Sequence, residues 1–143
     1  AWNHLIQEKK IPASKIFIFG ESLGSGPSIQ LALEAPAAGL ITEGAFASTR
    51  EMAKMVFPFL PVSILPIRDQ YDNLSKIKNV RVPKLIAHGR EDEIVPFSHG
   101  ETLFNSASEP KIFLPLPGTH NSARFQSGKL YMEALEKFFK SNI

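Results

Sequence analysis

Short apolar runs alternate with amphipathic segments along most of the chain. Residues 16–19 (IFIF) are apolar at every position, which is typical of a strand covered on both faces, and residues 25–35 then place apolar side chains at helical spacing. Three further apolar runs predict strands at residues 40–42, 84–87 and 111–116. Strands that alternate with helices favour an α/β fold, in which helices flank a parallel sheet.

The remaining apolar residues predict two more helices and one long excursion. One helix should follow Pro96 and run through Phe104, and another should lie near the C-terminus, where apolar residues recur on one face. Residues 47–82, between the second and third strands, contain many apolar side chains interrupted by prolines. A connection of about 36 residues inside a compact domain is usually functional, so we expect a cap-like excursion above the sheet.

Composition narrows the class of protein and its partners. The 143 residues suffice for a single domain over residues 1–143 and not for two. The formal net charge is only +2 and no run of five like charges occurs, so nucleic acid is not an expected partner. No apolar stretch is long enough for a membrane span and no signal-peptide pattern occurs, which makes the cytoplasm the default expectation. The absence of cysteine excludes thiolate metal sites and cysteine nucleophiles.

A candidate nucleophile lies at the turn between the first strand and the first helix. The sequence Gly20-Glu21-Ser22-Leu23-Gly24 follows IFIF directly, which is the context in which G-x-S-x-G forms a nucleophile elbow. A serine on so sharp a turn has a strained backbone, and small residues on either side let the strand and the helix approach closely. The backbone N–H of Leu23, at the start of the following helix, would then donate one hydrogen bond to an oxyanion.

The chemical partners of this serine should come from two later loops, because the hydroxyl needs an imidazole base and a carboxylate that fixes the tautomer of that imidazole. Glu91, Asp92 and Glu93 follow the third strand, and each is a candidate acid. His120 follows the fourth strand on a glycine-containing loop and is the candidate base, whereas the other three histidines fall in helix or strand segments. Both loops lie at carboxyl ends of strands, where α/β sheets place their sites.

Three segments together resemble the α/β-hydrolase superfamily: GESLGSG at residues 20–26, PKLIAHGREDEIVPFSHG at residues 83–100 and LPGTHN at residues 116–121. The chain is most similar to the branch of small serine hydrolases that includes protein depalmitoylases, and residues 72–77 (DNLSKI) are similar to that branch too. The resemblance covers nearly the whole chain. It implies that Ser22 is the nucleophile, Asp92 the acid and His120 the base.

The resemblance also implies that the four predicted strands correspond to the last four of an eight-stranded sheet. The family's first four strands, and the loop that supplies the second oxyanion donor, have no counterpart before Ala1. Residues 16–19 would then form an open edge of the sheet. We expect a missing N-terminal half, a partner chain or self-association to cover that edge.

These residues predict a serine hydrolase that cleaves a carboxylic ester, a thioester or an amide through an acyl-enzyme on Ser22. The substrate would be a small acyl compound or an acylated protein, and no metal or cofactor is indicated. Apolar residues of the excursion are expected to form a wall for the acyl group: Phe57, Phe59, Leu60 and Leu65.

Two other interpretations compete with this one. The first is a non-catalytic fragment or binding module on a hydrolase-like fold, because a fold alone does not fix a function. The second is a NAD-binding Rossmann-like domain, since Gly20, Gly24 and Gly26 resemble a dinucleotide-binding turn and Glu43 follows the next strand. Against the second interpretation, Glu21 would repel a phosphate group and no Tyr-x-x-x-Lys pair occurs in the sequence.

Overall fold

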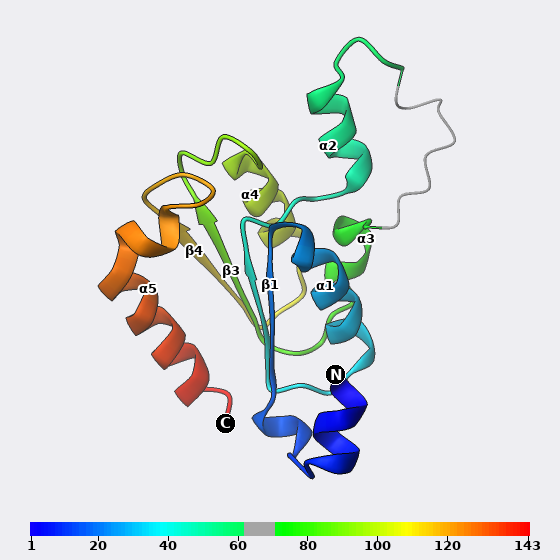
Figure 1. Cartoon of the computed structure of the whole chain (residues 1–143), viewed down its shortest axis with the longest axis vertical. Helices are drawn as coiled ribbons and strands as arrows, with labels where there is room; N and C mark the ends of the chain where they lie inside the picture. Colours follow the sequence, from blue (N-terminus) through cyan, green and yellow to red (C-terminus); the bar gives the residue numbers. More distant parts are fainter. Residues whose placement is uncertain (62–70) are drawn as a thin grey trace.

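Four parallel strands form the sheet that positions the candidate site. In the computed structural model, which describes residues 1–61 and 71–143, these strands lie side by side in chain order (Figure 1). They are β1 (Phe17–Glu21), β2 (Gly39–Glu43), β3 (Lys84–Gly89) and β4 (Lys111–Leu116). The predicted parallel sheet of an α/β fold is therefore confirmed.

The first three strands continue one or two residues beyond their predicted ends. Backbone pairing continues there although the side chains are no longer apolar, because the hydrogen-bonded ladder needs only peptide groups. Gly20 pairs with Thr42, and Glu21 pairs with Glu43. The additional residues bring polar side chains to the carboxyl edge of the sheet, where both predicted catalytic loops begin.

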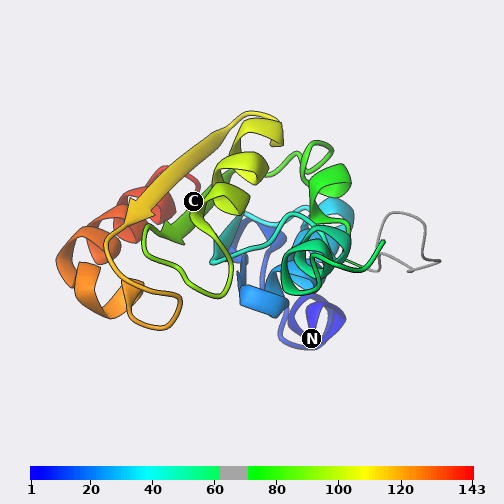
Figure 2. The same ribbon diagram turned by 90° about the horizontal axis from the view of Figure 1, so that it is seen from above.

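Helices cover both faces of the sheet (Figures 1 and 2). One face is covered by α1 (Ser25–Glu34), α3 (Asn73–Ile77) and α4 (Phe97–Ser106), and the other by α5 (Ala123–Lys140). The helices predicted after Pro96 and near the C-terminus are confirmed as α4 and α5. Two short helical turns precede β1, at His4–Glu8 and Ala13–Lys15.

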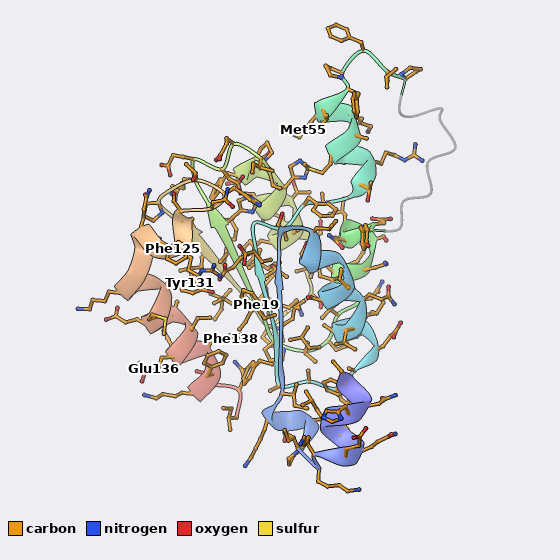
Figure 3. All side chains as sticks on the ribbon, in the orientation of Figure 1. Phe19, Met55, Phe125, Tyr131, Glu136 and Phe138 are labelled. Carbon is orange, nitrogen blue, oxygen red and sulfur yellow. The ribbon has the colours of Figure 1, made fainter. Side chains whose placement is uncertain are left out.

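The sheet separates two apolar cores, one on each face. The core beneath α1, α3 and α4 includes Ile18, Ile29, Leu40, Ile77, Ile86 and Leu103. The core beneath α5 includes Ile41, Leu85, Leu114, Leu116, Tyr131 and Phe138, and Figure 3 shows Tyr131 and Phe138 on the side of α5 that faces the sheet. Because β2 and β3 are buried along their whole length, these central strands hold the loops at their carboxyl ends firmly in place.

One edge of the sheet is formed by β1. This strand pairs with β2 on one side, and no strand of the described residues pairs with its other side. Phe19, labelled on β1 in Figure 3, is 47% exposed. An apolar edge with unpaired peptide groups favours association with a further strand.

The excursion predicted over residues 47–82 contains α3 and also α2 (Thr49–Val56), which lies beyond the carboxyl ends of the strands at the top of Figure 1. Ser48 caps α2, since its hydroxyl accepts a hydrogen bond from the Glu51 N–H at 3.1 Å. Residues 62–70, which include Leu65, lie outside the described residues. In the part of the chain that the structure describes, no helix combines the length and the apolar character needed to cross a membrane.

Candidate active site

Ser22 lies immediately after β1, in a short 3-10 turn (Ser22–Gly24) that leads into α1. Its backbone has a φ of 49°, a left-handed conformation that residues other than glycine rarely adopt, so the expected strain is present. Gly20 has to be glycine, because a Cβ atom there would lie 2.3 Å from the Ser28 hydroxyl oxygen. The expected steric need at Gly24 is not found, since a Cβ atom would meet nothing within 4 Å among the described residues.

The imidazole of His120 connects the serine to a carboxylate. Its Nε2 lies 2.9 Å from the Ser22 Oγ, although the two residues are 98 positions apart in the sequence. Its Nδ1 lies 2.7 Å from the Asp92 Oδ2. Because an ionised carboxylate can only accept, Nδ1 carries the proton and Nε2 is left to accept the hydrogen bond of the serine hydroxyl. The structure thus brings together Ser22, His120 and Asp92 in one hydrogen-bonded chain.

The carboxylate of Asp92 is held in place by the loop that carries it. Its Oδ1 accepts hydrogen bonds from the backbone N–H groups of Ile94 at 3.0 Å and Val95 at 2.8 Å. Asp92 is buried, with 8% of its surface exposed. Three donors therefore compensate the burial of this carboxylate and leave its Oδ2 facing the imidazole.

The three candidate acids, of which the family resemblance favoured Asp92, contact different parts of the histidine loop. Glu91 accepts a hydrogen bond from the backbone N–H of Gly118, and Glu93 accepts one from the backbone N–H of His120 at 3.2 Å. Only the Asp92 carboxylate lies against the imidazole ring itself. The loop after β3 thus holds the loop after β4 through all three carboxylates, and one of them is placed to orient the base.

His88 lies beneath Asp92 and is almost completely buried. Its Nε2 is 2.8 Å from the Val95 carbonyl oxygen and 3.3 Å from the Asp92 Oδ2. The pKa of His88 is lowered overall, because the effect of burial exceeds the opposing effects of the hydrogen bond to Val95 and the charge of Asp92. A neutral His88 therefore donates its Nε2–H to the Val95 carbonyl group and supports the loop that carries Asp92.

A cluster of three charged side chains lies next to Ser22, His120 and Asp92, and the sequence did not reveal this cluster. The Nη1 of Arg124 lies 3.3 Å from the Glu21 Oε2 and 3.4 Å from the Glu43 Oε2. Burial raises the pKa of Glu43 to about 7, Arg124 lowers it, and the neighbouring Glu21 raises it. Sequence spacing could not reveal this group, because its members come from β1, β2 and α5 and meet only in the folded sheet.

An apolar pocket opens beside the serine. It has a volume of about 300 Å³ and is lined by Ser22, Leu23, Phe46, Thr49, Met52, Tyr71, Ile94 and Val95. The sequence pointed instead to Phe57, Phe59 and Leu60, which do not line this pocket and are 54%, 98% and 52% exposed. They follow α2, the helix that carries Met55 in Figure 3. Their role as a wall for the acyl group stays a prediction.

Among the described residues, no cluster of side chains next to this site could hold a metal ion. Over residues 1–61 and 71–143, no three or more histidine, aspartate or glutamate side chains are arranged to hold a metal ion. The polar side chains around Ser22 are instead paired with one another. The site thus combines a serine hydroxyl that is hydrogen-bonded to an imidazole with an apolar pocket beside it.

Comparison with known proteins finds relatives in sequence and in fold. The chain is 33% identical over 132 residues to an uncharacterized protein of Mycobacterium tuberculosis, covering 92% of the chain and 47% of that relative. It is 30% identical over 148 residues to the human alpha/beta hydrolase domain-containing protein 17B, covering all of the chain and 48% of that protein. The chain has the fold of the α/β-hydrolases and resembles members of that superfamily over nearly its whole length. No protein-family model matches it.

Solved structures agree with this assignment at the level of the fold. The chain superposes on the monoacylglycerol lipase of Paleococcus ferrophilus with a TM-score of 0.70 at 19% identity, covering 99% of the chain and 73% of the lipase. The chain spans about half the length of the curated relatives that it matches. The resemblance stated from the sequence motifs is therefore confirmed, and the Rossmann-like alternative is not supported.

Proposed function

We propose that this α/β-hydrolase chain carries the catalytic residues of a serine hydrolase. The observation that carries the proposal is the continuous hydrogen-bonded chain from Ser22 through His120 to Asp92. Three groups of these types, joined in this order, form the arrangement that activates a hydroxyl for acyl transfer. The fold alone would not support this conclusion, because α/β folds also serve proteins without catalytic activity.

In the proposed reaction, the Ser22 Oγ attacks the carbonyl carbon of an ester, thioester or amide while its proton moves to the His120 Nε2. Asp92 stabilises the imidazolium that forms, and His120 then delivers the proton to the leaving group. A water molecule then attacks the carbonyl carbon of the acyl-enzyme while its proton moves to the His120 Nε2. His120 returns this proton to the Ser22 Oγ as the bond to the acyl group breaks and the acid is released. The backbone N–H of Leu23 donates one hydrogen bond to the developing oxyanion.

The pocket beside Ser22 supports an acyl substrate with an apolar chain. Phe46, Met52 and Val95 line it, and its volume of about 300 Å³ is at the small end of ligand pockets. We propose a short or medium acyl group here, carried by a small ester or by an acylated protein. For longer chains, Phe57, Phe59 and Leu60 would extend the apolar wall toward the end of α2.

We further propose that the full-length protein completes both the sheet and the oxyanion site. The relatives are about twice as long as this chain, and β1 has an unpaired side within the described residues. Strands that pair with β1 would cover its apolar edge, and a loop among them would supply the second oxyanion donor. Residues 1–143 would then be one part of a larger α/β domain.

Covalent labelling of the full-length protein with a fluorophosphonate probe tests the proposed function. Phosphonylation requires an activated serine and no knowledge of the substrate. We expect one adduct in the intact mass, no adduct in Ser22→Ala, and strongly slowed labelling in His120→Ala. Ser25→Ala is the matched control, because Ser25 is a serine in the same turn whose hydroxyl is paired with no histidine among the described residues. This hydroxyl donates to the Ser22 carbonyl oxygen at 2.6 Å. An unlabelled wild-type protein would favour the non-catalytic alternative.

A further inference from the structure

Arg124 connects the segment that carries the candidate nucleophile to the segment that carries the candidate base. Arg124 is the second residue of α5 and follows His120 by four positions. Its Nη1 lies 3.3 Å from the carboxylate of Glu21, the residue directly before Ser22. The same nitrogen lies 3.4 Å from the carboxylate of Glu43, at the end of β2.

We infer that Arg124 is a positioning residue, which holds the His120 loop against the Ser22 turn by contacting Glu21 and Glu43 together. This inference rests on the proposed serine-hydrolase function, because only then does the distance between the imidazole and the hydroxyl limit a reaction. Arg124 does not touch the reacting atoms. It acts through the relative placement of Ser22 and His120.

The surroundings of Glu43 explain why a cation is needed at this point. Glu43 is buried, with 8% of its surface exposed, and its Oε1 has no hydrogen-bond partner among the described residues. Glu21 carries a second negative charge close by, because β1 pairs with β2 and places Glu21 opposite Glu43. Without Arg124 the two carboxylates would repel each other at the base of the nucleophile turn.

Packing around His120 leaves little room for the imidazole to move elsewhere. Arg124, Glu21, Glu43 and His120 line one small cavity of about 20 Å³, enough for about one water molecule. The start of α5 is thus in contact with the ends of β1 and β2 through this group. If the ion pairs are lost, the first turn of α5 and the preceding loop, residues 117–122, lose this contact with β1 and β2, and the carboxylates of the loop after β3 have to hold the histidine loop without it.

The remainder of α5 does not depend on Arg124. Tyr131 and Phe138 are 4% and 2% exposed in the core beneath α5 and anchor the helix independently. The Arg124 side chain itself is 38% exposed. Its removal is therefore expected to loosen the loop that carries His120 without unfolding the domain, which separates a positioning role from a general structural one.

The test uses the full-length protein and three variants: Arg124→Gln, Arg124→Lys and Arg90→Gln. Arg90 is the matched control, because its guanidinium lies 5.1 Å from the Phe97 ring just as that of Arg124 lies 5.1 Å from the Phe125 ring. The readouts are the rate of fluorophosphonate labelling, kcat and KM for a p-nitrophenyl ester, and hydrogen exchange of the backbone amides of residues 117–122. Wild type and Ser22→Ala are measured alongside.

We expect Arg124→Gln to lower the labelling rate and kcat by about 10- to 100-fold with little change in KM, since a displaced base slows the chemical step. Hydrogen exchange at residues 117–122 should accelerate in the same variant. Arg124→Lys should recover part of both effects, because an ammonium group keeps the charge and loses the planar fork. Arg90→Gln should stay within about twofold of wild type in every readout.

Three outcomes have distinct meanings. If wild type is labelled at Ser22 and Arg124→Gln matches it in rate and in hydrogen exchange, the positioning role is overturned and the hydrolase function stands. If wild type is not labelled, the hydrolase function fails and the positioning role fails with it. If Arg124→Gln does not fold, Arg124→Lys decides the matter, because its shorter side chain weakens the contacts with Glu21 and Glu43. Labelling and hydrogen exchange equal to those of wild type would overturn the positioning role, and slower labelling with faster exchange would support it.

Discussion

The backbone of Gly44 lies directly against the imidazole ring of His120. A Cβ atom at this position would be 3.0 Å from the His120 Cε1 and 3.2 Å from its Nδ1. Gly44 also has a φ of 53°, in the left-handed region. The residue after Glu43 thus forms one wall of the space in which the proposed base is held, and its lack of a side chain sets the position of the ring.

Gly44→Ala is therefore expected to push the ring of His120 away from Ser22. We expect kcat for a p-nitrophenyl ester to fall by about tenfold or more, because the base is displaced from the hydroxyl. The left-handed backbone adds a cost of about 1 kcal/mol in the free energy of unfolding. Steady-state kinetics and denaturant unfolding measure the two effects separately. Unchanged kcat in a folded variant would contradict the contact.

Replacing Asp92 tests the assignment of the acid. In Asp92→Asn the amide nitrogen cannot accept the Nδ1 proton, so the imidazole loses the tautomer that activates Ser22. We expect kcat to fall by about 10³- to 10⁴-fold at neutral pH.

Glu91→Gln and Glu93→Gln are the matched controls for Asp92→Asn. Each glutamine keeps a carbonyl oxygen that can accept the backbone N–H bonded to that residue in the histidine loop. Both variants should retain activity to within about tenfold of wild type. A larger loss in Glu93→Gln than in Asp92→Asn would reassign the acid.

Glu43 predicts an unusual dependence of stability on pH. Its pKa is raised from 4.5 in the unfolded chain to about 7 in the folded state, so the folded state binds the proton more tightly. The contribution of Glu43 to the free energy of unfolding is therefore most favourable below pH 4.5 and is lost as the pH rises toward 7.

Glu43→Gln removes this titration and keeps the shape of the side chain. The difference between the free energies of unfolding at pH 5 and pH 8 should be smaller in the variant than in wild type, by about 2 to 3 kcal/mol. Urea unfolding of both proteins at several pH values measures this difference, and subtraction cancels the contributions of all other groups that the two proteins share. Parallel curves for the two proteins would show that Glu43 is ionised throughout.

The pocket beside Ser22 predicts which residues set the preferred acyl chain length. Met52→Trp places a larger side chain in the pocket and should lower kcat/KM for dodecanoyl relative to acetyl p-nitrophenyl esters by about tenfold or more. If the exposed wall contributes, Phe57→Ala and Phe59→Ala should change the preference among the longest chains only. An unchanged chain-length profile in Met52→Trp would place the acyl group elsewhere.

Much of the sheet, and the proposed nucleophile and base, could be predicted from the sequence because their signals are local. Residues 16–19 are apolar at every position, and the serine follows them within one turn. His120 stands out because it lies on a loop after a strand. These features depend on neighbours in the chain, so periodicity and turn chemistry suffice.

What could not be predicted depends on contacts between distant segments. Among Glu91, Asp92 and Glu93, only the family resemblance favours Asp92 in the sequence, and the contacts with the histidine loop distinguish the three carboxylates physically. The pocket residues Phe46, just before the excursion, and Tyr71, within it, are 25 positions apart and come into contact only in the folded chain. The apolar residues most evident in the sequence are exposed instead, because hydrophobicity alone does not say which side chains become buried.

The 98 positions that separate Ser22 from His120 have a consequence for how the domain folds. In the described sheet β2 and β3 lie between β1 and β4, so the hydrogen bond joins loops that all four strands have to place. Contacts of such long sequence separation form late, because closing a large loop costs chain entropy before any contact repays it. The reactivity of Ser22 would therefore appear only in the last stage of folding, and the rate at which a refolding sample regains labelling would time the closing of the whole sheet.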